Sequence, residues 1–405
     1  MGIRPIDYNV RPMQIRLRTL TLILWLIALF DASGVVYYGQ NTPMAGPLVA
    51  TTNGAQDSVL LIEADSGRIR AFSTGEGIHS VWDFSPDGCE LLVTVTSAYG
   101  LPRLLIVSLT GEVISQPVHY LDQPESLWGV WEPDWSPDGT RIAFRMMRDS
   151  LEGEPERQYH IGWVSPEGSE PAFYSVSGRE HSPKWSPDGS WLAYVSYDKR
   201  APGVDDRSTA EPTAEDLTAP EDLIQEADLW VVSSDASVKM RMTGFETGSV
   251  RSPRWSPDGQ WIGFVYSPSP SNDTYWVVPN NDASPEQQVT YGYGLSLDLT
   301  WTPDGELLAS ARGLGGQTTH GLWRVPVSVG SDNLLSPFIS SDLLPYPDYP
   351  AFNASGTRLA VRSGYRVALV DIATTKISFV VGAEGNMPLI WSPESFSSEA
   401  NCAGK

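Results

Sequence analysis

The sequence has few cysteines and no catalytic signature. Only two cysteines, Cys89 and Cys402, occur among 405 residues, which excludes a cysteine-rich zinc or disulfide framework. There is no Cys-x-x-Cys, His-Glu-x-x-His or phosphate-binding glycine-rich loop, and no Gly-x-Ser-x-Gly motif of a hydrolase nucleophile. The sequence therefore predicts no catalytic, cofactor-binding or metal-binding residues.

Positive charge is also scarce. The chain has 27 Lys and Arg against 49 Asp and Glu, a formal net charge of −22. Binding to a nucleic-acid backbone needs clustered Lys and Arg, so a nucleic-acid partner is not expected. The same balance argues against contact with an anionic membrane surface.

No long apolar run is present that would by itself span a membrane. Four arginines within the first 18 residues precede a charge-free stretch of twelve residues, 19–30. A bilayer span needs about 20 apolar residues, so residues 1–40 are interpreted as a signal peptide or signal anchor, forming an N-terminal apolar helix. Two alternatives stay open: a cleaved signal, or an anchor in the cytoplasmic membrane through residues 19–38. Both predict an exported protein, periplasmic or extracellular, that meets the membrane only through this segment.

What the sequence does contain is a repeat. An aromatic residue followed by Ser-Pro-Asp-Gly occurs at residues 84–88, 135–139, 185–189 and 255–259, with variants at 301–305, 352–356 and 391–394. The aromatic positions 84, 135, 185, 255, 301, 352 and 391 are separated by 51, 50, 70, 46, 51 and 39 residues. A period near 50 is typical of a repeat architecture.

Each repeat reads as a tight turn entering a buried strand. Pro presets φ, Asp bonds back to nearby amides, and Gly takes the left-handed conformation that closes the turn. Apolar residues follow at once, and further strand-like segments complete four strands per repeat, which predicts a propeller blade. The turn aspartates are therefore interpreted as structural: Asp87, Asp138, Asp188, Asp258 and Asp304.

These Trp-Ser-Pro-Asp-Gly repeats, with their Ile-Ala-Phe-like and Leu-Trp-Val-Val-like strands, resemble TolB-type (WD-repeat-like) β-propeller repeats. Similar repeats occur in the propeller parts of prolyl-oligopeptidase-like enzymes. The resemblance covers about residues 46–394 and implies the fold rather than one function. TolB's separate N-terminal α/β domain has no counterpart before the first predicted strand, so the TolB transport role is not expected.

We expect an all-β, seven-bladed propeller over residues 48–394, with six blades as the alternative count. A linker, residues 41–47, precedes it, and a C-terminal tail, residues 395–405, follows. Three strand-like pieces near residues 48–72 lack a preceding turn, and residues 387–391 supply a lone first strand. Together they predict one composite blade in which the N- and C-terminal strands close the ring and remove exposed sheet edges.

The closure bears on the two cysteines. The tail leaves the composite blade at the face carrying the pentapeptide turns, and Cys89 lies on that face of the next blade. We therefore hypothesise a disulfide between Cys89 and Cys402, which an exported compartment favours.

Residues 197–228 form an acidic insertion within one blade. Ten Asp and Glu lie there among Ala, Pro and Thr, a composition that cannot bury a core and predicts a flexible loop. Two interpretations stay open: a filler loop, or a lid or partner-docking segment.

The residues just before each innermost strand are the one predicted binding region. In a propeller they surround the central channel on the face opposite the turns, and mixed aromatic and charged side chains suit a ligand site. The candidates are His79, Trp131, Glu180, His181, Arg251, Asp298, Asp348 and Tyr349.

The sequence favours a non-enzymatic, extracytoplasmic module that binds a protein or peptide of the cell envelope without a cofactor. The alternative is a propeller hydrolase or lyase with a site at the channel mouth, which requires His79, His181 and Asp298 to converge. A scaffold role without any ligand is a third possibility.

Overall fold

The computed structural model describes residues 42–96, 100–118, 129–148, 158–174, 178–197, 227–269, 272–280, 286–288, 295–312, 320–325, 327, 336–339, 342–383 and 388–402. The predicted N-terminal helix and membrane anchor, in residues 1–41, lie outside these ranges. So does most of the acidic insertion, residues 198–226. Within the described ranges, no helix is long and apolar enough to cross a bilayer.

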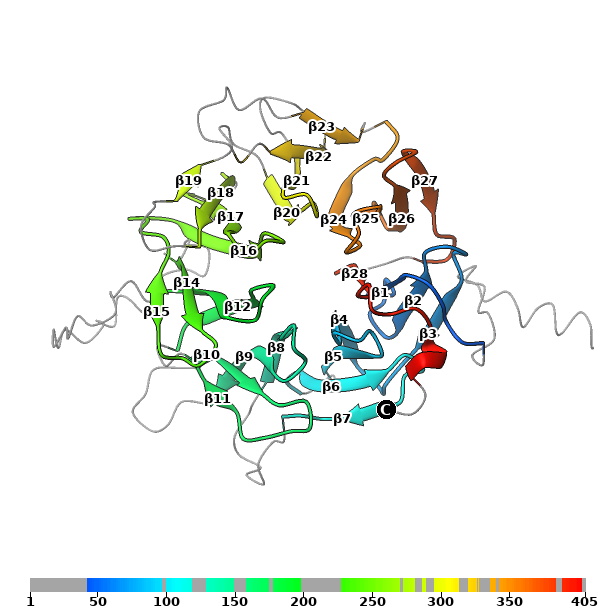
Figure 1. The fold of residues 1–405 in the computed structure, drawn as a ribbon, viewed down its shortest axis with the longest axis horizontal. Helices are drawn as coiled ribbons and strands as arrows, with labels where there is room; N and C mark the ends of the chain where they lie inside the picture. The colour runs from blue at the N-terminus through cyan, green and yellow to red at the C-terminus, as the bar shows by residue number, and fades with distance from the viewer. Residues whose placement is uncertain are drawn as a thin grey trace, which may run out of the picture.

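Seven four-stranded antiparallel sheets form a ring in the described part of the chain (Figure 1). We number them blades 1 to 6 from β4 to β27, four strands each, and blade 7 contains β28, β1, β2 and β3 in that order. The predicted seven blades are thus confirmed, and the alternative of six is wrong.

The innermost strands are β4 (Ile78–Phe84), β8 (Gly129–Trp135), β12 (Glu180–Trp185), β16 (Ser249–Trp255), β20 (Leu295–Trp301), β24 (Pro347–Phe352) and β28 (Ile390–Trp391). The second strands are β5 (Glu90–Thr96), β9 (Ile142–Arg148), β13 (Trp191–Ser196), β17 (Trp261–Ser267), β21 (Leu307–Arg312), β25 (Arg358–Ser363) and β1 (Leu48–Thr52).

The third strands are β6 (Arg103–Ser108), β10 (Gln158–Val164), β14 (Asp228–Ser233), β18 (Thr274–Pro279), β22 (His320–Val325), β26 (Arg366–Asp371) and β2 (Val59–Glu63). The outer strands are β7 (Val113–Ser115), β11 (Ala172–Phe173), β15 (Lys239–Arg241), β19 (Gln287–Gln288), β23 (Ser336–Ile339), β27 (Lys376–Phe379) and β3 (Ile69–Phe72). A short 3-10 helix, η2 (Glu399–Cys402), ends the described chain.

The middle strands carry the core because neighbouring blades cover both of their faces. β1 and β2 are buried at every position, which explains why they read as continuous apolar runs rather than alternating ones. The aromatic residue before each turn packs between blades. Trp135 of blade 2, for example, packs with Leu92 and Ile106 of blade 1.

The pentapeptide turns have the geometry that their residues predict. In the turn of blade 3, Ser186 Oγ donates to Asp188 Oδ1 at 2.6 Å, and the same oxygen accepts the Ser190 amide at 3.0 Å. Gly189 closes the turn with a φ of +70°. The hydrogen bond from Ser186 is the main reason why the pKa of Asp188 lies below its ordinary value.

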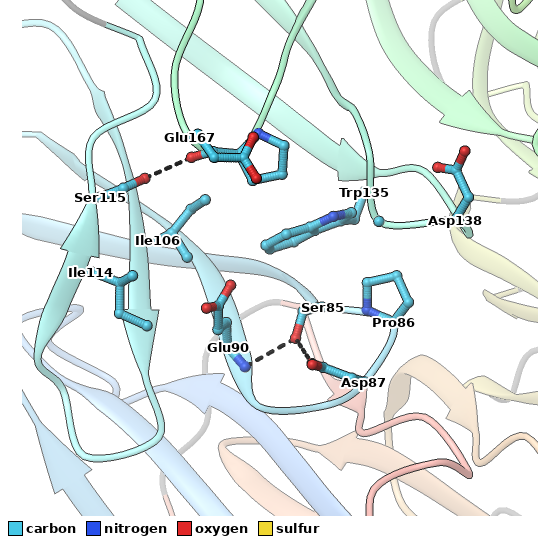
Figure 2. A pocket seen from close by; sticks show the side chains of 12 residues that line it. Ser85, Pro86, Asp87, Glu90, Ile106, Ile114, Ser115, Trp135, Asp138 and Glu167 are labelled. Atoms are coloured by element: carbon cyan, nitrogen blue, oxygen red, sulfur yellow. Dashed lines mark hydrogen bonds between the residues drawn. The ribbon is translucent and has the colours of Figure 1, made fainter. Parts of the chain in front are cut away.

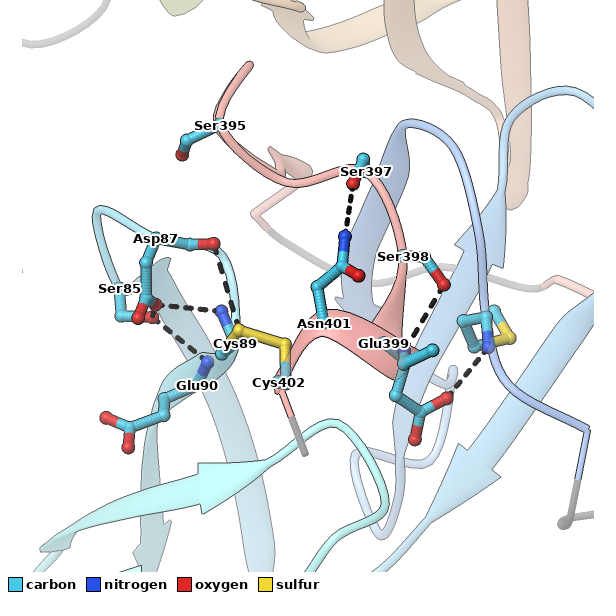
Figure 3. Close-up of a disulfide and its surroundings, with 12 residues drawn as sticks. Ser85, Asp87, Cys89, Glu90, Ser395, Ser397, Ser398, Glu399, Asn401 and Cys402 are labelled. Atoms are coloured by element: carbon cyan, nitrogen blue, oxygen red, sulfur yellow. Dashed lines mark hydrogen bonds between the residues drawn. A yellow bond between two sulfur atoms is a disulfide. The ribbon is translucent and has the colours of Figure 1, made fainter. Parts of the chain in front are cut away.

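The two ends of the described chain meet on the turn face. β28 lies beside β1, where Val49 pairs with Trp391 and Ala50 with Ile390. The tail then crosses to blade 1, where Cys402 and Cys89 form a disulfide with Cα atoms 5.5 Å apart (Figure 3). The sequence separation of the two cysteines is 313 residues.

Buried polar contacts fasten the same tail. Arg70 of blade 7, which is 5% exposed, donates to Glu399 at 2.8 Å, to the carbonyl of Leu109 at 3.0 Å and to that of Thr42 at 2.8 Å. The other oxygen of Glu399 accepts the Met44 amide at 2.7 Å. The tail is therefore part of the folded core rather than an appendage.

A glycine in the first turn tests this packing. An alanine Cβ at Gly88 would lie 2.5 Å from Cβ of the buried Phe396, whereas at Gly189 the closest atom, Pro137 Cδ, is 3.6 Å away. Both glycines have positive φ, so both Gly→Ala substitutions cost about 1–2 kcal/mol of backbone strain. Gly88→Ala must also displace the tail, and we expect it to lower the free energy of unfolding by about 1–3 kcal/mol more than Gly189→Ala. Urea unfolding of both variants measures the difference, and equal losses would contradict this packing.

Candidate functional site

The innermost strands share a distortion near their starting ends. The face where these strands begin, opposite the turn face, is called the entry face below. Four residues there have φ between +52° and +56°, namely Glu132, Ser182, Ser252 and Tyr349. Each precedes a proline and lies in a β-bulge, where the register with the second strand shifts. Left-handed conformations are unfavourable for such residues, and strain of this kind is concentrated at functional sites.

One group of charged side chains lies between blades 5 and 6. Asp348, near the start of β24, accepts a hydrogen bond from Arg362 at 2.9 Å. Its other oxygen lies 3.2 Å from His320 Nε2, the first residue of β22. That pair is close but lacks the alignment of a hydrogen bond, and both side chains are about one-tenth exposed. Burial alone would raise the pKa of Asp348, but the adjacent His320 and Arg362 outweigh it and hold that pKa below its ordinary value.

Two tyrosines extend this group. The ring of Tyr346 meets the His320 ring edge-on, with centroids 5.8 Å apart, and Tyr346 is 64% exposed. The guanidinium of Arg362 lies 5.0 Å from the centroid of Tyr349. We call His320, Tyr346, Asp348, Tyr349 and Arg362 the His320 cluster.

Two further residues predicted from the sequence, Arg251 and Asp298, influence Tyr349 electrostatically. Burial raises the pKa of Tyr349, and the charges of Asp298 and Arg251 also influence it. Arg251 is paired with Asp273 at 2.6 Å, and Asp298 lies 3.6 Å from Arg254. The predicted residues Arg251, Asp298, Asp348 and Tyr349 therefore belong to one sector of the entry face, in blades 4 to 6.

A second group lies in blades 2 and 3. Trp131 meets Tyr159 edge-on at 6.0 Å, and the Arg145 guanidinium lies 3.9 Å from the Tyr159 centroid. His181 packs against Tyr197 with ring centroids 5.5 Å apart. Burial lowers the pKa of His181 to about 4, so this ring is neutral at physiological pH.

The remaining two predicted residues are internal. His79 is 0% exposed, and its ring nitrogens lie 3.1 Å from the Gly77 carbonyl and 3.1 Å from the Thr74 hydroxyl. Glu180 is also 0% exposed and lies 4.0 Å from His160. In the described part of the chain, no hydrogen bond or ion pair joins His79, His181 and Asp298, which lie in blades 1, 3 and 5.

His320, Arg362 and Tyr346 are not among the residues predicted from the sequence, which were taken from the starts of the innermost strands alone. The third strand of a blade also begins at the entry face. His320 therefore lies level with the start of β24 in the next blade. Four innermost strands also share the pattern Pro-x-aromatic, at Pro133, Pro183, Pro253 and Pro350, which is the sequence signal of the bulge.

The described residues of the entry face include groups that can transfer a proton. Among all the described residues, no group of three His, Cys, Asp or Glu side chains could hold a metal ion. A histidine beside an ionised carboxylate can accept and return a proton, and a nearby exposed phenol can donate one. The His320 cluster combines these groups with an arginine.

An acidic pair near the axis has a different character. Asp83 of β4 accepts the Trp135 amide at 3.1 Å, and Asp134 of β8 accepts the Trp185 amide at 2.7 Å and the Lys184 ammonium. Burial, and then the negative charge of Asp134, raise the pKa of Asp83 to about 7, against an opposing effect of Lys184. These carboxylates connect adjacent blades, and we interpret them as structural.

Asp83 should make stability depend on pH. The folded protein holds its proton up to about pH 7, whereas the unfolded chain releases it near 3.8, so the free energy of unfolding falls as pH rises between these values. We expect Asp83→Asn to remove this slope and to stabilise the protein by about 1–2 kcal/mol near neutral pH, with no gain near pH 4. Urea unfolding across pH measures it. Asp138→Asn is the control of opposite sign, because the Ser136 hydrogen bond lowers the pKa of Asp138. A slope unchanged by Asp83→Asn would contradict the assignment.

No protein-family model matches the sequence. The chain is 28% identical over 152 residues to an uncharacterized protein of Agrobacterium fabrum, covering 36% of this chain and 50% of that protein. It is 26% identical over 143 residues to the uncharacterized peptidase YuxL of Bacillus subtilis, covering 35% of this chain and 18% of the peptidase. It is 27% identical over 220 residues to a probable dipeptidyl-peptidase 5 of Arthroderma benhamiae, covering 51% of this chain and 28% of that protein. The chain thus spans half or less of these relatives.

Solved structures share the fold at low identity. An oligogalacturonate lyase from Vibrio parahaemolyticus superposes with a TM-score of 0.54 at 12% identity, over 84% of this chain and 94% of the lyase. A puromycin hydrolase superposes with a TM-score of 0.55 at 12% identity, over 88% and 56% of the two chains. TolB from Acinetobacter baumannii superposes with a TM-score of 0.45 at 14% identity, over 86% of this chain and 66% of TolB. At these identities only the fold is shared. The chain is therefore a seven-bladed β-propeller whose Ser-Pro-Asp-Gly repeats resemble those of TolB-type propellers.

Proposed function

We propose that this protein is a propeller enzyme of the lyase or hydrolase kind, with its site at the entry face between blades 5 and 6. The observation that carries the proposal is His320 Nε2 lying 3.2 Å from Asp348, beside Arg362 and the exposed Tyr346. Histidine is the side chain best suited to proton transfer near neutral pH, and an ionised carboxylate orients it. This proposal replaces the non-enzymatic reading that the sequence alone favoured.

Elimination suits the cluster better than attack by a protein nucleophile. The sequence contains no Gly-x-Ser-x-Gly motif, and elimination needs only a base, an acid and positive charge. His320 would take a proton from the carbon beside a substrate carboxylate, and a carbon–carbon double bond would form. The adjacent carbon–oxygen bond would break, and Tyr346 would protonate the leaving oxygen. Arg251 and Arg362 would stabilise the negative charge that develops at the substrate carboxylate.

The fold neighbours support this class of chemistry. Among them are an oligogalacturonate lyase and a puromycin hydrolase with TM-scores above 0.5, and two sequence relatives are named as peptidases. An oligosaccharide that carries carboxylates is the substrate class that fits both the arginines of the entry face and the lyase neighbour.

The compartment belongs to the same proposal. We infer export from the basic and apolar N-terminal pattern, together with a disulfide, which persists in oxidising compartments. Whether residues 19–38 remain as an anchor concerns residues outside those the structure describes. The ring itself is proposed to be closed by the pairing of β28 with β1 and by the tail disulfide.

A panel of acidic polysaccharides tests the function directly. The full chain is incubated with polygalacturonate, alginate and hyaluronan, and the ultraviolet absorbance of the new double bond is followed. We expect one polymer to be cleaved in a His320-dependent manner. If a polymer binds in calorimetry but none is cleaved, the protein is a binding module, and the enzyme proposal is wrong.

A further inference from the structure

We propose that the turn face of blade 1 is a docking groove for a basic, extended segment of a partner protein, which pairs with the edge of β7. This surface lies on the opposite face from the His320 cluster, so the proposal does not depend on the enzyme activity. The protein or peptide partner predicted from the sequence would thus bind at blade 1 through a basic, extended segment.

Among the described residues, the strand β7 is the outer edge of the blade 1 sheet. Val113 and Ile114 are 46% and 51% exposed, and in the described part of the chain β7 pairs with β6 alone. Three other outer strands carry residues that discourage pairing: Lys239 and Arg241 in β15, Pro337 in β23 and Lys376 in β27. Strand edges without Lys or Pro are templates for an added strand.

A groove runs along both sides of this edge. One cavity of about 480 Å³ lies between blades 1 and 2 and is lined by Ile106, Ile114 and Trp135, with Glu167 on its far wall (Figure 2). A second cavity of about 620 Å³ extends from β7 to η2 and the disulfide. The two share Asp87, Glu90 and Ile114, so they are parts of one groove. Ser115 Oγ donates to the Pro166 carbonyl at 2.8 Å and fixes β7 against blade 2.

The charges of the groove select the occupant. Its lining carries the carboxylates of Glu90, Glu112 and Glu167 and the turn aspartates Asp87 and Asp138, and none of the lining residues is Lys, Arg or His. Glu399 also lines it but is already paired with Arg70. The corresponding cavity between blades 5 and 6 differs, because Arg324 lines it and forms an ion pair with Glu306 at 2.9 Å. Charge complementarity therefore favours a Lys- or Arg-rich segment at blade 1.

Apolar contacts determine the form of that segment. An extended peptide alternates its side chains, so every second residue can face the exposed Ile114 while the others reach the carboxylates. Main-chain hydrogen bonds to β7 supply affinity that is independent of sequence. A basic strand with alternating apolar residues is the expected ligand.

Fluorescent peptides test the proposal. The probe is a twelve-residue peptide of alternating Lys and Val, compared with its Glu and Val counterpart, and binding to the full chain is measured by polarisation. We expect only the Lys peptide to bind, with affinity falling at least about tenfold when salt rises from 0.05 to 0.5 M. Ile114→Lys should weaken binding at least about tenfold. Phe379→Lys, at the 38% exposed edge of β27, is the matched control and should leave binding unchanged.

Several outcomes would overturn the proposal. They are equal binding of both peptides, full affinity in Ile114→Lys, equal losses in both variants, or no binding of the Lys peptide at millimolar concentration. A peptide of residues 1–18 that binds more tightly would assign the groove to this chain's own basic segment. Dimerisation that Ile114→Lys abolishes would assign it to a second copy. Thermal unfolding of both variants ensures that a loss of binding is not a loss of fold.

Discussion

Cys89→Ser is expected to lower the free energy of unfolding of the oxidised protein by about 3–5 kcal/mol, and Cys402→Ser by the same amount. The disulfide joins residues that are 313 positions apart. Its loss therefore increases the conformational entropy of the unfolded chain, because the long loop between the two cysteines is no longer closed. The folded state also loses restraint, because the tail carries the buried Phe396 and the Glu399 partner of Arg70.

Urea unfolding with and without reductant measures this effect. Reduction of the wild-type protein should reproduce the loss seen in either variant, and the double variant should lose no more than a single one. Reductant should not affect the variants themselves. If reduction leaves the wild-type midpoint unchanged, the bond does not contribute to stability, and the tail is held by its noncovalent contacts alone.

His320→Gln is expected to reduce turnover of the cleaved polymer about 10²–10⁴-fold, which is the usual contribution of a positioned acid or base. The variant keeps a polar side chain beside Asp348, so the fold and the Michaelis constant should change little. Asp348→Asn should cause a smaller loss, because it leaves the base in place but removes the charge that orients it. The measurement is kcat and KM at several pH values.

His181→Gln is the matched control for this prediction. His181 also lies at the entry face, but in blade 3, packed against Tyr197. Its substitution should leave turnover within about threefold of the wild type if the site lies between blades 5 and 6. A loss as large as that of His320→Gln would move the site to blades 2 and 3. Full activity in His320→Gln would contradict the assigned base.

The sequence predicted the local elements well, because their signals are short-range. A residue pattern such as Ser186-Pro187-Asp188-Gly189 specifies its own turn through the fixed φ of Pro and the positive φ of Gly. The lone first strand expected within residues 387–391 is β28, Ile390–Trp391. The seven-blade count followed from adding the incomplete pieces at the two ends.

The candidate site was predicted only in part, because it depends on which side chains meet across blades. Four of the eight predicted residues lie in one sector, whereas His79 and Glu180 are buried inside their blades. A single innermost strand contains no information about its neighbour in the ring. The bulge at Tyr349 further changes which residues face the same way, and His320 enters from a third strand.

By itself, the sequence determined that this chain forms blades and that its two cysteines belong to one face, and it favoured seven blades over six. These properties follow from repeated local patterns, and each repeat needs its neighbours only to bury apolar faces. Only the tertiary structure decided that His320 meets Asp348, that the charge of Asp134 raises the pKa of Asp83, and that β7, among the described residues, pairs on one side alone. Those contacts join residues from different strands or blades, so their geometry is set by the curvature of the ring and by the bulges rather than by any local pattern.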